Sequence, residues 1–198
     1  MSPGARSMSF VTFVVAISLM LACSRSGWTT GGPYYHYNGA PAIFDTVPMR
    51  WTFGCSFPPE MRDAAASGFD FWERTIGVDL FERTDDCDAF GTSGGIVVSY
   101  VDRYDVDGDE IRERVVGETW MRGRSERLTG GSIVFYLAWK EASALSMRNA
   151  SAHEVGHSLG FAHNGRHDCV MFEYVSDEEK AACDDEVTTL GELYAGSR

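Results

Sequence analysis

The chain has 198 residues, a formal net charge of -12 at pH 7 and an isoelectric point of about 4.7. This length suits one domain with a buried core and excludes two domains of ordinary size. The excess of Asp and Glu argues against nucleic acids and other polyanions as partners, because proteins hold those ligands mainly with Lys and Arg.

The first 22 residues have the composition of an export signal. Residues 10–22 (FVTFVVAISLMLA) form an apolar run behind a single basic residue, Arg6, and end in small residues. The run is shorter than the roughly 20 apolar residues that a membrane-spanning helix needs. We therefore predict a signal peptide over residues 1–22, and the alternative is a buried N-terminal helix.

A cysteine follows this run directly. The sequence MLAC at 20–23 resembles a bacterial lipobox, in which the cysteine is lipidated and becomes the new N-terminus. The alternative is ordinary cleavage near Ala22, so membrane contact is expected only through a lipid on Cys23. Residues 23–44 are rich in Gly, Ser and aromatic residues and are predicted to form a flexible tether, with His36 as a solvated loop residue.

The folded domain is expected over residues 45–198, and it begins with a strand, a helix and a strand. Residues 47–53 (VPMRWTF) and 78–84 (VDLFERT) have the pattern of strands. Between them, two prolines, apolar residues at helical spacing and a closing Gly77 predict a helix. Such a unit forms a right-handed crossover with its two strands parallel.

Four cysteines remain if Cys23 carries a lipid, and an even number suits two disulfides in an oxidising compartment. Cys55 and Cys87 each follow one of the two parallel strands, which finish at the same edge of the sheet. We therefore predict the pairs Cys55–Cys87 and Cys169–Cys183, although the other connectivities stay open.

Three further strands are expected over residues 94–101, 115–121 and 131–139. The acidic run at 102–110 (DRYDVDGDE) suggests calcium, but an EF-hand count places Arg103 at the first ligand position. A solvated turn is the preferred interpretation, and a calcium site is an unsupported alternative.

Four of the five histidines lie within the segment HEVGHSLGFAHNGRH, which starts at His153. A helix is expected to run into this segment and to place His153 and His157 on one face, where both can bind one zinc ion. Gly160 can end the helix in a left-handed conformation and turn the chain back. His163 can then reach the same ion, with Glu154 beside it.

Three histidine ligands leave one tetrahedral position open, which is typical of catalytic rather than structural zinc. One zinc ion is therefore the expected cofactor, and Glu154 is the expected catalytic residue. Glu154 would take a proton from the zinc-bound water as it attacks a peptide carbonyl, and would later deliver that proton to the leaving amine. His167 lies four residues beyond the motif and is interpreted as a solvated or cleft-rim side chain.

The motif HEVGHSLGFAH resembles the extended zinc motif of the metzincin metalloproteases, and the surrounding chain looks most like the matrixins. Met171 stands eight residues after His163, a spacing similar to that of the methionine turn of matrixins. The resemblance implies an α+β fold, with a mixed five-stranded twisted sheet, two long helices and a C-terminal helix at 184–195. Residues 115–121 would be an antiparallel edge strand, where an extended polypeptide substrate can bind.

Two aromatic residues near this site are not assigned to it. Trp120, in the expected edge strand, could line the cleft but is interpreted as a core residue. Tyr174 lies one residue further past Met171 than the tyrosine ligand of astacins and serralysins does. It is therefore interpreted as a packing or rim residue.

The sequence thus predicts an exported zinc endopeptidase that acts on polypeptides as a monomer. We expect it in the cell envelope if Cys23 is lipidated, and in the periplasm or outside the cell if it is not. One alternative is a non-catalytic surface lipoprotein that is stabilised by zinc and binds a partner, although the intact Glu154 argues against it. Another is a zinc amidase that acts on cell-wall peptide.

Overall fold

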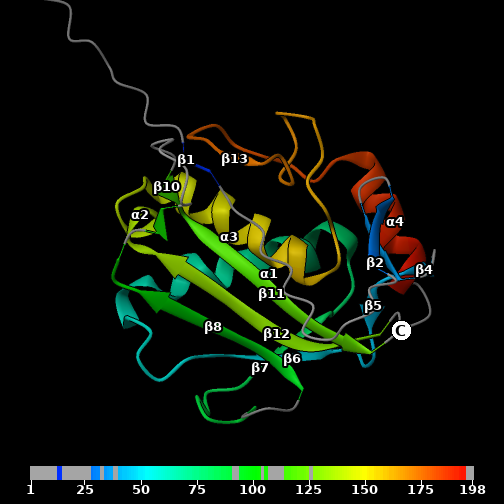
Figure 1. Ribbon diagram of the computed structural model, residues 1–198, viewed down its shortest axis with the longest axis horizontal. Helices are drawn as coiled ribbons and strands as arrows, with labels where there is room; N and C mark the ends of the chain where they lie inside the picture. Colours follow the sequence, from blue (N-terminus) through cyan, green and yellow to red (C-terminus); the bar gives the residue numbers. More distant parts are fainter. Residues whose placement is uncertain are drawn as a thin grey trace, which may run out of the picture.

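The computed structural model of the chain describes residues 13–14, 28–31, 34–37, 40–90, 94–103, 105–106, 114–124 and 127–194. Within these ranges a twisted sheet lies against two long helices (Figure 1).

The main sheet has six strands, one more than the sequence predicted. Their order is β11-β12-β8-β6-β7, with β5 paired separately to the first residues of β12. The pair β11 and β12 is antiparallel, and all other pairs in this sheet are parallel. The strands are β5 (Ile43–Phe44), β6 (Met49–Phe53), β7 (Phe81–Arg83), β8 (Gly95–Val101), β11 (Gly117–Arg124) and β12 (Arg127–Tyr136).

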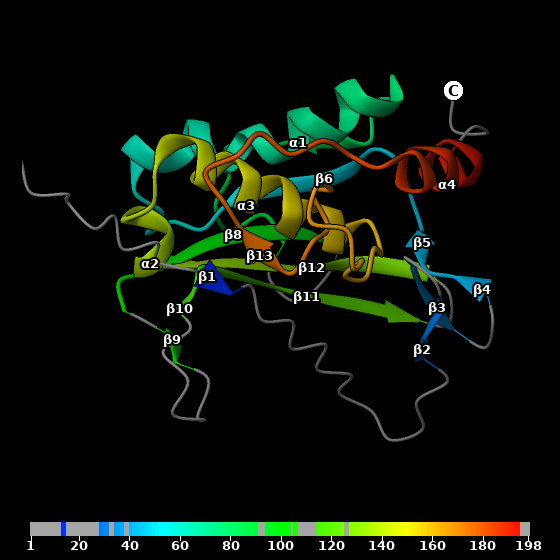
Figure 2. The same ribbon diagram turned by 90° about the horizontal axis from the view of Figure 1, so that it is seen from above.

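The two long helices both cover one face of this sheet (Figure 2). Helix α1 (Arg62–Ile76) follows a short 3-10 helix (Pro59–Met61) and ends at Gly77 as predicted, where a φ of 67° is left-handed. Helix α3 (Ala144–Ser158) is capped by Ser143, whose hydroxyl accepts a hydrogen bond from the backbone of Ser146. The remaining helices are α2 (Leu137–Lys140) and α4 (Asp184–Tyr194).

The strand predicted at 131–139 is shifted toward the N-terminus. It spans Arg127–Tyr136, and Leu137–Lys140 turn into a helix instead. Gly130 and Gly131 lie inside the strand, where the backbones of the neighbouring strands approach too closely for a side chain. A Cβ on Gly130 would lie 2.4 Å from the carbonyl oxygen of Gly95. Glycines that suggest a turn in the sequence therefore mark close backbone contact in the sheet.

The core lies between the sheet and the helices, and aromatic side chains fill much of it. Trp51 from the sheet stacks on Phe69 of α1 with ring centroids 4.0 Å apart. Helices α1 and α3 are in intimate contact, since the indole nitrogen of Trp72 donates to the carbonyl oxygen of Ala152 at 2.7 Å. A Cβ on Gly68 would lie only 2.4 Å from the carbonyl oxygen of Ser151. This contact fixes α3, and therefore the histidines that it carries.

The predicted flexible tether over 23–44 is wrong where the structure describes it. Ala42 and Phe44 are buried, and the backbone N–H of Phe44 donates to the hydroxyl of Tyr194 at 3.0 Å. The folded unit therefore begins before residue 45. Strands β2 (Trp28–Gly31), β3 (Tyr34–Tyr37) and β4 (Ala40–Pro41) form a separate three-stranded sheet, which places His36 in a strand rather than a loop. Thr, Trp and Tyr favour strands, and this preference outweighs the glycines around them.

Most of the predicted signal peptide, and Cys23 with it, lies outside the described residues. The exception is β1 (Phe13–Val14), which pairs with β10 (Arg114–Val115) and β13 (Tyr174–Val175) in a small sheet that β9 (Asp105–Val106) completes. In the part of the chain that the structure describes, no helix is both long and apolar enough to span a bilayer.

Both predicted disulfides are confirmed. Cys55 pairs with Cys87, and Cys169 pairs with Cys183. The first pair joins the ends of β6 and β7, which are parallel neighbours as the crossover required. Most of the acidic run at 102–110 lies outside the described residues, and the calcium alternative with it.

Candidate metal centre and catalytic carboxylate

Helix α3 carries the first two histidines of the motif on one buried face. His153 and His157 are 1% and 3% exposed, and their Nε2 atoms lie 2.8 Å apart. The four-residue spacing places one ring above the other, because residues four apart share a face of an α-helix. The helix itself thus forms two thirds of a metal-binding group.

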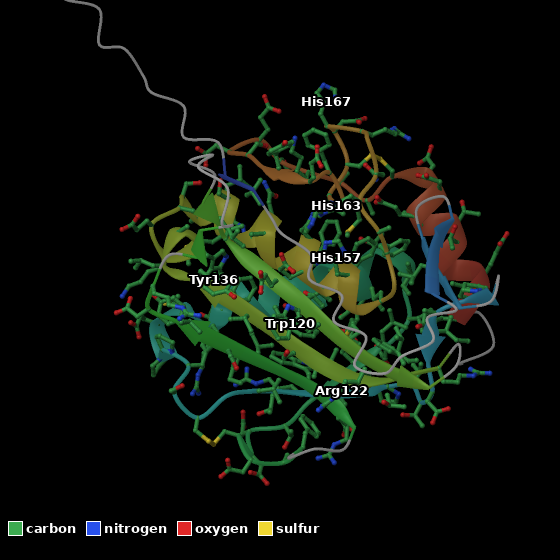
Figure 3. All side chains as sticks on the ribbon, viewed as in Figure 1. Trp120, Arg122, Tyr136, His157, His163 and His167 are labelled. Carbon is green, nitrogen blue, oxygen red and sulfur yellow. A yellow bond between two sulfur atoms is a disulfide. The ribbon has the colours of Figure 1, made fainter. Side chains whose placement is uncertain are left out.

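The chain after α3 brings the third histidine back to the same point. Gly160 has a φ of 99°, and the backbone N–H of Phe161 returns to the carbonyl oxygen of Gly156 at 3.1 Å. The reversal places His163 Nε2 3.1 Å from His153 Nε2. His157 and His163 are seen side by side above the sheet in Figure 3.

The three nitrogens have the spacing that a zinc ion requires. All three ligand atoms lie within 4.8 Å of one another. Tetrahedral zinc with bonds of about 2.0–2.1 Å would hold its ligands about 3.3 Å apart, close to the 3.1 and 2.8 Å that separate His153 Nε2 from the Nε2 atoms of His163 and His157. Adjustments of a few tenths of an ångström would accommodate the ion.

Backbone carbonyls fix which nitrogen of two rings faces the centre. His153 Nδ1 lies 2.8 Å from the carbonyl oxygen of Val170, and His157 Nδ1 lies 2.8 Å from that of Phe161. A carbonyl oxygen only accepts, so each Nδ1 carries the proton and donates. Each Nε2 therefore has a free lone pair, as metal ligation demands.

Burial keeps the histidines neutral. Loss of solvation, followed by repulsion from His163, lowers the pKa of His153 to about 3. Burial lowers the pKa of His163 to about 4, and burial with the neighbouring rings puts the pKa of His157 well below its ordinary value. Neutral imidazoles bind metal without first releasing a proton.

Glu154 directly follows His153 on α3, and its side chain packs against strand β11. It is 0% exposed, and burial raises its pKa to about 8. The Thr119 hydroxyl donates at 2.6 Å to Oε2, which lowers the pKa, whereas the nearby Glu118 raises it. The other oxygen, Oε1, has no hydrogen-bond partner among the described residues. One oxygen of the carboxylate is therefore held and the other is available.

Strand β11 makes room for this carboxylate with a residue that has no side chain. A Cβ on Gly117 would lie 3.1 Å from Glu154 Oε1 and 3.0 Å from its Cγ. Sequence reasoning missed both Gly117 and Thr119, since neither has a local motif. Their role follows only from the packing of the strand on α3.

Met171 packs directly against the helix that bears the histidines. It is 0% exposed, and a Cβ on Gly156 would lie 2.3 Å from its sulfur. The backbone N–H of Asn164 donates to the carbonyl oxygen of Met171 at 3.0 Å. The methionine of the predicted methionine turn is thus buried against the middle of the HEVGH segment.

The structure separates His167 from the other three histidines. Its side chain is 85% exposed at the tip of a loop, and it is not part of the group that could hold an ion (Figure 3). Tyr174 lies in β13 near the ring of Phe172, at 5.6 Å between centroids, and is likewise outside that group.

The prediction that Trp120 is a core residue is wrong. It is 38% exposed, the one large hydrophobic side chain of the described residues with this much exposure. It alternates with Thr119 on β11, so Thr119 faces α3 and Trp120 faces away. Because β11 is an edge strand and its side chains alternate between the two faces of the sheet, this indole lies on the surface.

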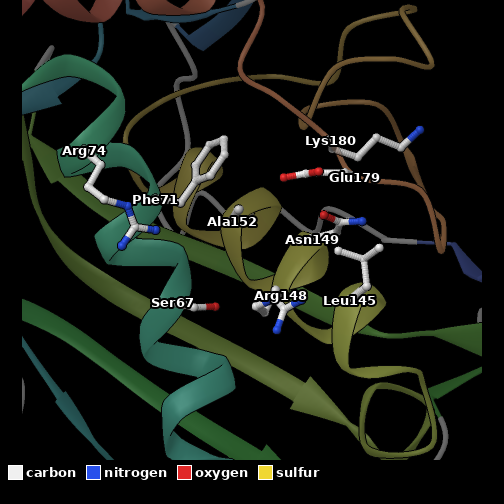
Figure 4. A pocket seen from close by; sticks show the side chains of 9 residues that line it. All are labelled: Ser67, Phe71, Arg74, Leu145, Arg148, Asn149, Ala152, Glu179 and Lys180. Atoms are coloured by element: carbon white, nitrogen blue, oxygen red, sulfur yellow. The ribbon is translucent and has the colours of Figure 1, made fainter.

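Neither a hollow between the two long helices nor two further groups of metal-binding residue types forms an alternative to this centre. A hollow of about 380 Å³ lies between α1 and α3, and none of the three histidines lines it (Figure 4). Two further groups of metal-binding residue types, around Cys55 and Cys169, contain the disulfide cysteines, whose sulfurs are already bonded.

Comparison with known proteins agrees with the geometry. The sequence model of the matrixin family matches residues 56–195, which include both long helices, all three histidines and Met171. A search of curated proteins gives no significant match. Because the matched range covers most of the chain, from the first helix to the end of α4, the chain belongs to the matrixins, a family of zinc-dependent metalloproteases.

Proposed function

We propose that the chain is a zinc-dependent endopeptidase in which His153, His157 and His163 hold one zinc ion and Glu154 is the catalytic residue. The observation that carries the proposal is the pairing of three convergent Nε2 atoms with a buried carboxylate whose Oε1 is unpartnered in the described part of the chain. A purely structural zinc site would be closed by a fourth protein ligand and would not need this carboxylate.

When bound, zinc supplies Lewis acidity, which polarises the scissile carbonyl and lowers the pKa of a water molecule toward 7, as is typical of catalytic sites. The remaining work belongs to the side chains. The Thr119 hydroxyl orients Glu154 by holding Oε2, so Oε1 is the atom that accepts a proton from the attacking water. The same atom then returns the proton to the leaving amine.

The charge of Glu154 depends on its neighbours. Its pKa of about 8 arises chiefly from burial. A zinc ion held by the three Nε2 atoms would lower the pKa of the Glu154 carboxyl, so the carboxylate would be ionised when it acts as a base. Replacement by Gln keeps the shape and removes the proton acceptor.

The proposed substrate is an extended polypeptide that lies along β11. In the main sheet this strand pairs only with β12 among the described residues, so its other edge can accept a further strand. Trp120, exposed on β11, would then contact one substrate side chain. This placement predicts weaker binding, seen as a higher KM, rather than slower chemistry when Trp120 is replaced by Ala.

We further propose that the protein is exported, and that Cys23 bears a lipid that anchors it to the cell envelope. The support is the MLAC sequence after an apolar run, together with two disulfides, which suit an oxidising compartment. Mass spectrometry of the protein from whole cells would find a diacylglyceryl cysteine at position 23. An unmodified N-terminus near residue 23 would refute the anchor and leave the peptidase proposal intact.

The deciding experiment compares the protein without its signal with its Glu154→Gln variant. Both should bind one zinc ion per chain, and only the unchanged protein should cleave denatured protein substrates and lose that activity on chelation. The general acid-base contribution implies a loss of about 100- to 10,000-fold in the variant. Full activity in Glu154→Gln would refute the mechanism.

Two other outcomes would redirect the assignment. Zinc at full occupancy without cleavage across a broad peptide library would favour a non-catalytic binding protein. Cleavage of peptidoglycan but not of denatured protein would favour a cell-wall amidase. Both alternatives keep the metal site and change only what it does.

A further inference from the structure

The buried carboxylate of Glu186 has no part in the proposed reaction. It lies in the first turn of α4 and is 0% exposed. Its two oxygens hold two separate segments: Oε1 accepts a hydrogen bond from Asn164 Nδ2, and Oε2 accepts one from the backbone N–H of Cys183 at 2.7 Å. The second bond caps α4, as a Glu in the first turn commonly does. The first bond has no role in the helix.

Asn164 directly follows the third histidine. Its backbone N–H donates to the carbonyl oxygen of Met171 at 3.0 Å, and its Oδ1 accepts from the backbone N–H of Arg166 at 3.0 Å. Of the polar atoms in this side chain, Nδ2 is therefore the one that reaches beyond the loop. The position of His163 depends on where this loop is held.

Glu186 is also connected to His153, through Cys183 and the residue after its disulfide partner. Cys183 is bonded to Cys169, and the residue after Cys169 is Val170. The Val170 carbonyl oxygen is the acceptor that orients His153 Nδ1, at 2.8 Å. The Val170 N–H is itself held by the carbonyl oxygen of Ala181, at 2.8 Å, just before the start of α4.

The supports of His157 are different. Its Nδ1 donates to Phe161, only four residues further along the chain, so this ring is oriented by the end of its own helix. Two of the three rings are thus connected to the start of α4, and one is not. The connection to His163 runs through a single side-chain hydrogen bond.

From these contacts we infer that Asn164 and Glu186 are positioning residues for the zinc centre, and that their hydrogen bond holds the His163 loop in the metal-binding conformation. The inference rests on the proposed zinc function. Partners behind the metal ligands typically change metal affinity by about 10- to 100-fold when removed. The C-terminal helix therefore has a role in metal retention in addition to its packing role.

The test uses the protein without its signal, loaded with zinc, and the variants Asn164→Asp and Asn164→Ala. Asn164→Asp keeps the Oδ1 acceptor for Arg166 and replaces the donor to Glu186 with a carboxylate oxygen, which also adds a negative charge beside Glu186, whereas Asn164→Ala removes the donor without adding charge. Neither variant touches the cap of α4. Glu192→Gln, an exposed carboxyl of the same helix, is the matched control.

Three measurements separate positioning from general stability: the rate of zinc release to a chelator, the absorption spectrum of the cobalt-substituted protein, and the melting temperature without metal. Both Asn164 variants should release zinc about 10- to 100-fold faster and should change the cobalt spectrum. The metal-free melting temperature should fall by several degrees in both Asn164 variants, because a buried hydrogen bond is lost, so zinc release is compared at a temperature where all the proteins are folded. Glu192→Gln should match the unchanged protein throughout.

The possible results distinguish a failure of the positioning role from a failure of the proposed zinc peptidase function. Zinc release within twofold of the unchanged protein in both Asn164 variants would overturn the positioning role, whatever happens to their melting temperatures, and would leave the peptidase proposal standing. Failure of the unchanged protein to bind zinc would overturn both.

Discussion

Replacement of Gly156 by Ala tests the packing of Met171 against the histidine helix. The added Cβ would lie 2.3 Å from Met171 Sδ and 2.9 Å from Trp72 Cζ2. Ordinary carbon contacts lie at about 3.5–4.0 Å, so Met171 would have to move by more than about 1 Å. Both side chains are 0% exposed, which leaves them little space to move into.

The expected cost follows from two opposing effects. Overpacking of a well-packed core costs about 1–3 kcal/mol, whereas Ala in place of Gly within a helix gains up to about 1 kcal/mol. We therefore expect Gly156→Ala to lower the free energy of unfolding by about 1–2 kcal/mol. It should also weaken zinc retention, because the carbonyl oxygen of Met171 accepts the backbone N–H of Asn164, the residue after His163.

A matched control lies in α4. A Cβ on Gly191 would meet nothing within 4 Å, so Gly191→Ala keeps the helix-propensity gain without the clash and should stabilise by about 0.5–1 kcal/mol. Urea unfolding of both variants, with zinc and with chelator, measures the difference. A Gly156→Ala protein as stable as Gly191→Ala would show that Met171 and Trp72 do not obstruct the added methyl group.

Further predictions concern the carboxylates and the histidines. Thr119→Val removes the donor to Glu154 Oε2. Because a hydrogen bond to a charged group contributes about 1.5–3 kcal/mol, kcat should fall by about 10- to 150-fold with zinc content unchanged. An unchanged kcat would contradict the orienting role. His167→Ala should keep full zinc content and His163→Ala should lose it, as metal analysis of the purified proteins would show; loss of zinc in His167→Ala would mean that the wrong third ligand was chosen. Burial raises the pKa of Glu186 from 4.5 to about 7. Between pH 4.5 and 7, the folded state therefore binds a proton on Glu186 that the unfolded state has released. The stabilisation from this carboxyl is complete below about pH 4.5 and is lost as the pH rises through 7. Relative to Glu186→Gln, the unfolding free energy of the unchanged protein should fall by on the order of 3 kcal/mol from pH 4.5 to 8; a difference that does not vary with pH would contradict the raised pKa.

The sequence alone determined the parts of this protein that depend on spacing along the chain. His153 and His157 share a helix face because they are four residues apart, and Gly160 supplies the reversal that returns His163 to them. The crossover from β6 to β7 likewise predicted which cysteines would meet. Such features are local, or follow from the fixed handedness of a single unit.

Only the tertiary structure decided which residues from other elements reach the site. Thr119 bonds Glu154 across 35 positions, and Asn164 bonds Glu186 across 22, without any motif in the sequence to mark either pair. The exposure of Trp120 and the burial of Phe44 were both misjudged, since an aromatic residue in a strand has the same composition whether its face is covered or open. Periodicity along the chain predicts which residues share a face, but what covers that face depends on how distant segments pack.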